Sequence, residues 1–152
     1  MPGRTEGLQV EGIIELFFSL KMFRLCLFLA IGWKVFIVDG SEIIRERLVT
    51  LLSEIKEIEI IGPTADAVEA TKFIFKSQPD AAILDIYFPR LSGMHVLRYI
   101  KEMKPTPMVI ILTNHSYPQY REKCLQAGAE FFFDKSTEFQ KVRRVEVKKW
   151  RS

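Results

Sequence analysis

Four polar residues each follow a short apolar run, where side-chain packing alone does not explain them. They are Asp39 after VFIV, Asp85 after AAIL, Thr113 after VIIL, and Lys135 just past EFFF. A carboxylate at the end of a buried strand is costly unless something pairs with it. Two carboxylates, a hydroxyl and an ammonium suit phosphoryl transfer onto an aspartate. One carboxylate would be the nucleophile, the other would help to hold a hard divalent cation, and the hydroxyl and ammonium would contact phosphoryl oxygens.

The segments around these residues predict how they meet. From Trp33 onward, apolar runs alternate with amphipathic segments, which is typical of an α/β domain with a parallel sheet. Strands are predicted over 34–40, 57–65, 81–86, 107–113 and 130–135. Helices are predicted over 41–55, 66–78, 92–104, 117–129 and 136–150. Because ligands of such sheets sit outside the carboxyl ends of the strands, we expect the polar residues to converge there.

Several separated motifs then identify a family resemblance. These are VFIVDG, then ILDIYFPRLSG with a proline four residues and a glycine eight residues after the acid, then VIILT and GAEFFFDKS. With these motifs, residues 34 to about 148 resemble the receiver domain of two-component response regulators. The resemblance implies a flavodoxin-like (βα)5 fold, a doubly wound parallel sheet with strand order 2-1-3-4-5. We expect residues 33–152 to form this domain.

The resemblance also implies roles for the site residues. Asp85 would be the phosphoacceptor, and Thr113 and Lys135 would bind the phosphoryl group. Mg²⁺ would be held by Asp39, Asp85 and the backbone carbonyl of Tyr87. The phosphoryl group would come from a histidine kinase or a phosphotransfer protein, which makes the chain a self-phosphorylating switch rather than a turnover enzyme.

Signalling would use one helical face of the domain. By the resemblance, Phe132 occupies the switch aromatic position, and a downstream protein reads the face formed by the fourth and fifth predicted helices. The chain ends at Ser152, directly after the last predicted helix, so we expect a stand-alone receiver; homodimerisation is left open. The net charge of +3 gives no reason to expect nucleic-acid binding. Cys26 and Cys124 form neither a disulfide framework nor a zinc motif, which favours the cytoplasm.

Gly40 is the main departure from the family pattern. The first strand usually ends in two adjacent acids, and here the second is a glycine, so the expected Mg²⁺ site is weakened. The alternative function is therefore a degenerate receiver that docks partner proteins without phosphorylation. Asp39 has an alternative of its own, as the N-cap of the following helix. An aspartate-nucleophile phosphatase would need a second acid two residues after Asp85, and Tyr87 stands there instead.

Residues 1–32 lie outside the resemblance. Their apolar stretch is interrupted by Glu15, Lys21 and Arg24, and the uninterrupted part is too short to span a bilayer, so a membrane is not favoured. Three interpretations stay open: an upstream extension without a folded role, a helix that docks on a partner or membrane, and a cleaved signal.

Overall fold

The structure is a computed structural model that describes residues 32–149, with side chains to Val145, and positions 12, 15, 16, 19 and 20. The chain divides into two units, residues 1–32 and 33–152. Positions 12, 15, 16, 19 and 20 are helical and exposed, Gly32 is neither, and the rest of that segment lies outside the described residues. Among the residues that are described, no helix is long and apolar enough to cross a membrane.

The second unit is built on one parallel sheet. Its strands are β1 (Trp33–Val38), β2 (Ile58–Thr64), β3 (Ala81–Leu84), β4 (Met108–Thr113) and β5 (Phe131–Asp134). Their order in the sheet is β2-β1-β3-β4-β5, and every neighbouring pair is parallel. This confirms the predicted flavodoxin-like fold and its strand order.

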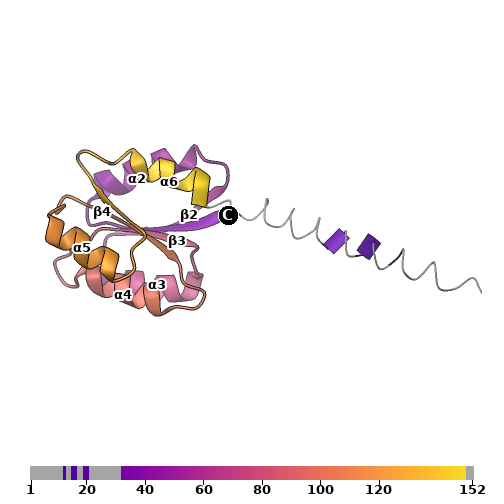
Figure 1. Cartoon of the computed structure of the whole chain (residues 1–152), viewed down its shortest axis with the longest axis horizontal. Coiled ribbons are helices and arrows are strands. Elements are labelled where there is room, and N and C mark those ends of the chain that lie inside the picture. Colours follow the sequence, from indigo (N-terminus) through magenta and orange to yellow (C-terminus); the bar gives the residue numbers. More distant parts are fainter. Residues whose placement is uncertain (1–11, 13–14, 17–18, 21–31, 150–152) are drawn as a thin grey trace, which may run out of the picture. The chain divides into compact units, whose positions relative to one another are not determined.

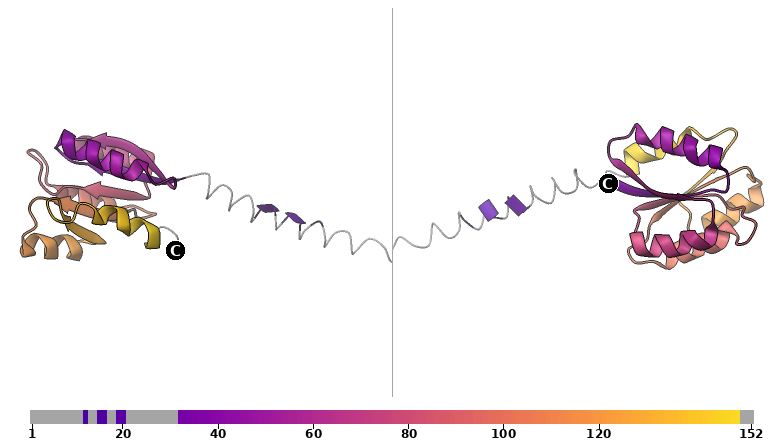
Figure 2. Two further views of the ribbon diagram at one scale, coloured as in Figure 1. Left: turned by 90° about the horizontal axis from the view of Figure 1, so that it is seen from above. Right: turned by 180° about the vertical axis from the view of Figure 1, so that it is seen from behind.

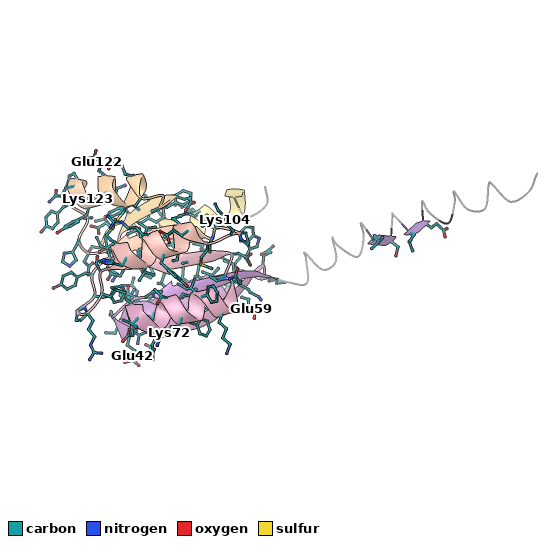
Figure 3. The ribbon with its side chains drawn as sticks, turned by 90° about the horizontal axis from the view of Figure 1, so that it is seen from below. Glu42, Glu59, Lys72, Lys104, Glu122 and Lys123 are labelled. Carbon is teal, nitrogen blue, oxygen red and sulfur yellow. The ribbon has the colours of Figure 1, made fainter. Side chains whose placement is uncertain are left out.

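Helices cover both faces of the sheet, as Figures 1 and 2 show. They are α2 (Glu42–Ser53), α3 (Ala67–Ser77), α4 (Gly93–Glu102), α5 (Pro118–Gln126) and α6 (Lys141–Lys149). Helices α2 and α6 lie on one face, and α3, α4 and α5 lie on the other (Figure 1). Charged side chains such as Lys72 of α3 and Glu122 of α5 project outward from the helices (Figure 3).

Strand β1 shows how the sheet separates two cores. Val35 and Ile37 join the cluster under α2 and α6, whereas Phe36 and Val38 join the cluster under α3, α4 and α5. Successive side chains of a strand point to opposite faces, so a central strand must be apolar at every position. The continuous VFIV run therefore encodes a strand that is covered on both faces.

The start of α2 excludes the alternative role of Asp39 as an N-cap, and the start of α6 differs from the prediction. Ser41, not Asp39, is the N-cap of α2, and its hydroxyl accepts from the backbone N–H of Ile44. The last helix begins at Lys141 rather than at 136. The Asp134 carboxylate accepts from the backbone N–H groups of Ser136 and Thr137, at 2.7 and 3.1 Å, which holds that segment in a turn.

We propose that residues 33–152 fold without the preceding segment. A chain that begins at Gly32 is expected to unfold cooperatively at the melting temperature of the full chain, because all five strands and both core clusters lie from Trp33 onward. Thermal unfolding followed by circular dichroism measures this. An insoluble product, or a melt without a cooperative transition, would place residues 1–32 in the folding unit.

Candidate functional site

The carboxyl edge of the sheet gathers the polar residues singled out in the sequence. Asp39 and Asp85 directly follow β1 and β3, which are neighbours in the sheet, and Lys135 directly follows β5. The Nζ of Lys135 lies 2.6 Å from Oδ2 of Asp85 and 2.7 Å from Oδ2 of Asp39. One ammonium therefore joins two carboxylates that are 46 residues apart in the chain, with the lysine a further 50 residues beyond Asp85.

All three charges are buried. The exposed fractions are 2% for Asp39, 9% for Asp85 and 7% for Lys135. A buried carboxylate needs a charged or hydrogen-bonded partner, and here two carboxylates share one ammonium. The cluster thus holds a net negative charge at the sheet edge, which an added cation would neutralise.

Backbone groups of the β3–α4 loop complete the surroundings of Asp85. The N–H of Tyr87 donates to Oδ1 of Asp85 at 3.2 Å, and the N–H of Gly93 donates to the carbonyl of Ile86 at 3.0 Å. Gly93 lies so close that a Cβ there would stand 2.1 Å from the carbonyl oxygen of Asp85. The glycine eight residues after the acid is therefore required by the close approach of two backbone segments.

The side chains of Thr113 and Phe132 form no hydrogen bond with this cluster among the described residues. Thr113 is fully buried, and its Oγ1 accepts from the backbone N–H of His115 at 3.1 Å. Within the described residues, no side-chain hydrogen bond joins Thr113 to Asp85 or Lys135; its carbonyl accepts from the N–H of Lys135. Phe132 is 3% exposed, and the guanidinium of Arg121 lies 5.0 Å from its ring centroid.

The comparison with known families agrees with this geometry. The sequence profile of the response regulator receiver domain matches residues 35–145, which include β1 from Val35 onward and all of the other four strands. The chain belongs to the response regulator receiver family. It is accordingly a receiver domain of two-component signalling, the family in which phosphoryl acceptance and Mg²⁺ binding at an acidic pocket are general.

Individual relatives and solved structures are also similar to this chain. The chain is 37% identical over 112 residues to protein-glutamate methylesterase/protein-glutamine glutaminase 1 of Carboxydothermus hydrogenoformans, covering 72% of this chain and 33% of that protein. The receiver domain of NarL from Mycobacterium tuberculosis superimposes with a TM-score of 0.68 at 28% identity, covering 76% of this chain and 94% of that one. The response regulator domain of Thermotoga maritima CheB gives 0.67 at 25% identity, covering 79% and 94%.

The receiver spans about half or less of the length of the curated relatives it matches. Some of these relatives are methylesterases that carry a receiver region within a larger enzyme. The expectation that this receiver works alone therefore stays a prediction.

Two contacts of the site had no signal in the sequence. The Nη1 of Arg45, in the first turn of α2, donates to the carbonyl of Asp39 at 2.7 Å. The hydroxyl of Ser116 donates to the carboxylate of Asp134 in a short hydrogen bond. Ser116 and Asp134 meet only because β4 and β5 are neighbours in the sheet, so no local spacing pattern marks their contact. Arg45 reaches back six residues to a backbone carbonyl, which every residue type offers, so the sequence does not mark that contact either.

The donor set of the receiver fits Mg²⁺. Asp39 and Asp85 present oxygens close together, and Mg²⁺ is typically bound through one or two carboxylates while it keeps several waters. No group of three or more His, Cys, Asp or Glu side chains is placed to hold a metal among the described residues. Glu42, a candidate substitute for the missing acid, is exposed at the outer surface (Figure 3). The pocket is therefore poor in acids but not without them.

The pKa of Asp39 is raised above its ordinary value of 3.8, because burial penalises the ionised carboxylate. Hydrogen bonds from Lys135 and from the backbone of Ser41 oppose this rise without cancelling it. The folded state therefore binds the Asp39 proton more tightly than the unfolded state does. Stability contributed by this group is present below pH 3.8 and is lost as the pH rises through the raised pKa.

Unfolding measured over a series of pH values tests whether the stability contributed by Asp39 falls as the pH rises. In urea unfolding, the free energy of unfolding of Asp39→Asn minus that of the parent is expected to increase as the pH rises through this window, because the asparagine cannot ionise. Asp134 is the matched control, since a hydrogen bond from Ser116 and the backbone N–H of Ser136 lower its pKa. The same difference for Asp134→Asn should decrease as the pH rises. Parallel slopes for the two variants would refute the raised pKa of Asp39.

Gly40 offers a direct test of the metal site. It is exposed, and a Cβ at this position would meet nothing within 4 Å, so Gly40→Asp fits without a clash. A third carboxylate beside Asp39 and Asp85 is expected to tighten Mg²⁺ binding and, through like-charge repulsion, to lower the melting temperature without Mg²⁺. The melting temperature of the variant should then rise more steeply with added Mg²⁺ than that of the parent.

Glu42→Gln tests whether Glu42 takes the place of the acid that is missing at position 40. If Glu42 already serves as a substitute ligand, Glu42→Gln would flatten the response to Mg²⁺ and Gly40→Asp would gain little. Its exposed position leads us to expect a curve like that of the parent. If the melting temperatures of the parent and both variants do not change with the Mg²⁺ concentration, the receiver has no metal site.

Proposed function

We propose that this receiver takes a phosphoryl group on Asp85 from a phosphohistidine of a histidine kinase or phosphotransfer protein. The observation that carries the proposal is the contact of the Lys135 ammonium with both Asp85 and Asp39, at 2.6 and 2.7 Å. A nucleophilic carboxylate with a cation and a second carboxylate beside it is suited to phosphoryl transfer, which depends on positioning and on stabilising the developing charge.

In the proposed step, a carboxylate oxygen of Asp85 attacks phosphorus while the bond between phosphorus and the donor imidazole nitrogen breaks. The bonding electron pair returns to that nitrogen, and an acyl phosphate forms on Asp85. Lys135, which contacts Asp85, would pair with a phosphoryl oxygen, and Thr113 would supply its hydroxyl. Mg²⁺ held by Asp39, Asp85 and the carbonyl of Tyr87 would neutralise charge on the transferring group.

We propose that the output is read on the face formed by α5, β5 and α6. Arg121 of α5 lies over Phe132 of β5 and is 3.3 Å from Glu138, in the segment before α6. These contacts connect the elements on which a downstream protein would act, and Phe132 would be the switch residue. The protein is then a self-modifying switch in the cytoplasm, with no nucleic acid required at this face.

A second function is favoured by one observation, the glycine at position 40. A receiver with a weakened metal site would dock partners without phosphorylation. Incubation of the full chain with acetyl phosphate and Mg²⁺, followed by intact-mass measurement, separates the two. A gain of one phosphoryl group supports phosphorylation, and an unchanged mass under conditions that label an ordinary receiver supports docking alone.

A further inference from the structure

A groove lies next to the proposed phosphoacceptor and is lined by Ile86 and Tyr87, the two residues that follow Asp85. Its volume is about 420 Å³, and it is formed by the β3–α4 loop, the start of α4, the β4–α5 loop and the start of α5. Four aromatic side chains line its rim: Tyr87, His115, Tyr117 and Tyr120. Phe88, which is 8% exposed, also lines it. The groove thus combines a buried apolar residue with an aromatic rim.

The aromatic residues stand in two pairs. The rings of Tyr87 and His115 are 4.7 Å apart between centroids, and those of Tyr117 and Tyr120 are 6.1 Å apart. Tyr87 is 67% exposed and Tyr117 is 59% exposed. Exposed tyrosines gathered at a concave site are typical of protein-binding surfaces, because they bury a large area and keep a hydroxyl in contact with water.

The charge of the groove selects its partner. Arg90 lines it, and no aspartate or glutamate does. Within the described part of the chain, no salt bridge occupies the Arg90 guanidinium. An acidic residue of a partner would find this cation free, whereas a basic residue would be repelled.

Each wall of the groove is tied to a residue of the site. The N–H of Tyr87 donates to Oδ1 of Asp85, at 3.2 Å, and the N–H of His115 donates to Oγ1 of Thr113, at 3.1 Å. A phosphoryl group on Asp85 would change the acceptor facing Tyr87, and a shift of the Thr113 hydroxyl would change the acceptor facing His115. The Tyr87 wall of the groove is thereby bonded directly to the proposed phosphoacceptor.

We propose that this groove is a docking surface for a segment of a partner protein that carries one large apolar side chain flanked by acidic residues. The apolar side chain enters between the two aromatic pairs, and an acidic residue pairs with Arg90. The dependence on phosphorylation rests on the proposed function of Asp85, whereas docking to the unmodified protein does not.

The test uses the full chain and a fluorescent peptide in which one tryptophan is flanked by aspartates. Fluorescence anisotropy is expected to show saturable binding of the peptide, with a dissociation constant below about 1 mM. Tyr117→Ala and Arg90→Glu should each weaken binding about fivefold or more. Phe75→Ala and Lys72→Glu, which change exposed residues of α3 outside the groove, should leave it unchanged.

Two control peptides judge the chemistry of the partner. A peptide with lysines in place of the aspartates, and one with alanine in place of the tryptophan, should each bind at least about fivefold more weakly. Absence of saturable binding by the acidic peptide overturns the proposal. So does equal binding of the lysine peptide, or groove variants that bind as the parent does.

The link to Asp85 has its own readout. After treatment with acetyl phosphate and Mg²⁺, the dissociation constant of the acidic peptide is expected to change at least about twofold in the parent and to stay constant in Asp85→Asn. An unchanged constant in protein whose mass shows the phosphoryl group overturns the link. A mass without the phosphoryl group counts against the proposed function instead, and the peptide isotherms on unmodified protein still decide whether the groove docks a partner.

Discussion

Asp85→Asn is expected to abolish the gain of phosphoryl mass that the parent chain shows with acetyl phosphate and Mg²⁺, lowering the labelling rate at least about 100-fold. The amide has nearly the shape of the carboxylate but is a poor nucleophile. Because it is neutral, it also cannot serve as an anionic ligand for Mg²⁺. Intact-mass measurement over time gives the rate. Labelling of the variant at the rate of the parent would mean that another residue is the acceptor.

The variant should remain folded, which keeps the result interpretable. Lys135 still has Asp39 as its partner at 2.7 Å, so the substitution leaves no buried charge unpaired. Asp80→Asn is a matched control, because Asp80 immediately precedes the same strand, β3, and is exposed at its opposite end. Its carboxylate accepts from the N–H of Lys34 at 2.8 Å, far from the site in the sheet. Labelling of the control should match that of the parent.

Gly93→Ala is expected to lower the free energy of unfolding by about 3 kcal/mol, near the upper end for an overpacked site. The added Cβ would lie 2.1 Å from the carbonyl oxygen of Asp85 and 2.6 Å from Cα of Ile86. These are backbone atoms, which cannot rotate out of the way as a side chain would. The β3–α4 loop must therefore move, and Asp85 moves with it. Urea unfolding measures the loss of stability.

Gly40→Ala is the control for a glycine with open space around it. No atom lies within 4 Å of the position that its Cβ would take, so the free energy of unfolding should change by no more than about 0.5 kcal/mol.

Labelling of Asp85 should also slow in Gly93→Ala, in protein shown to be folded, because the carbonyl of the acceptor itself is displaced. Equal stability of Gly93→Ala and the parent would show that the two backbone segments do not approach this closely in solution.

Local pattern was sufficient to predict most of the fold. Apolar runs of four to seven residues and helical spacing depend only on neighbours along the chain, and they located all five strands and five helices of the second unit. The exceptions are at the ends of elements, where side-chain hydrogen bonds determine the residue at which a helix begins. Asp134 captures the N–H groups of Ser136 and Thr137, and α6 starts later than its apolar spacing suggested.

The sequence by itself determined which residues stand at the carboxyl edge of the sheet, because each stands at the end of a short apolar run, and the alternation of these runs with amphipathic helices predicts buried strands. It did not determine which of them meet. That Lys135 contacts both Asp39 and Asp85 follows from strand order, which brings together segments about 50 residues apart along the chain.

Tertiary structure alone also decided what surrounds the site. The aromatic groove with Arg90 joins the β3–α4 loop to the start of α5, and the short hydrogen bond of Ser116 with Asp134 joins the loop after β4 to the end of β5. Contacts of this kind leave no periodic trace in the sequence, because the distance along the chain between the partners is set by intervening helices rather than by the contact itself.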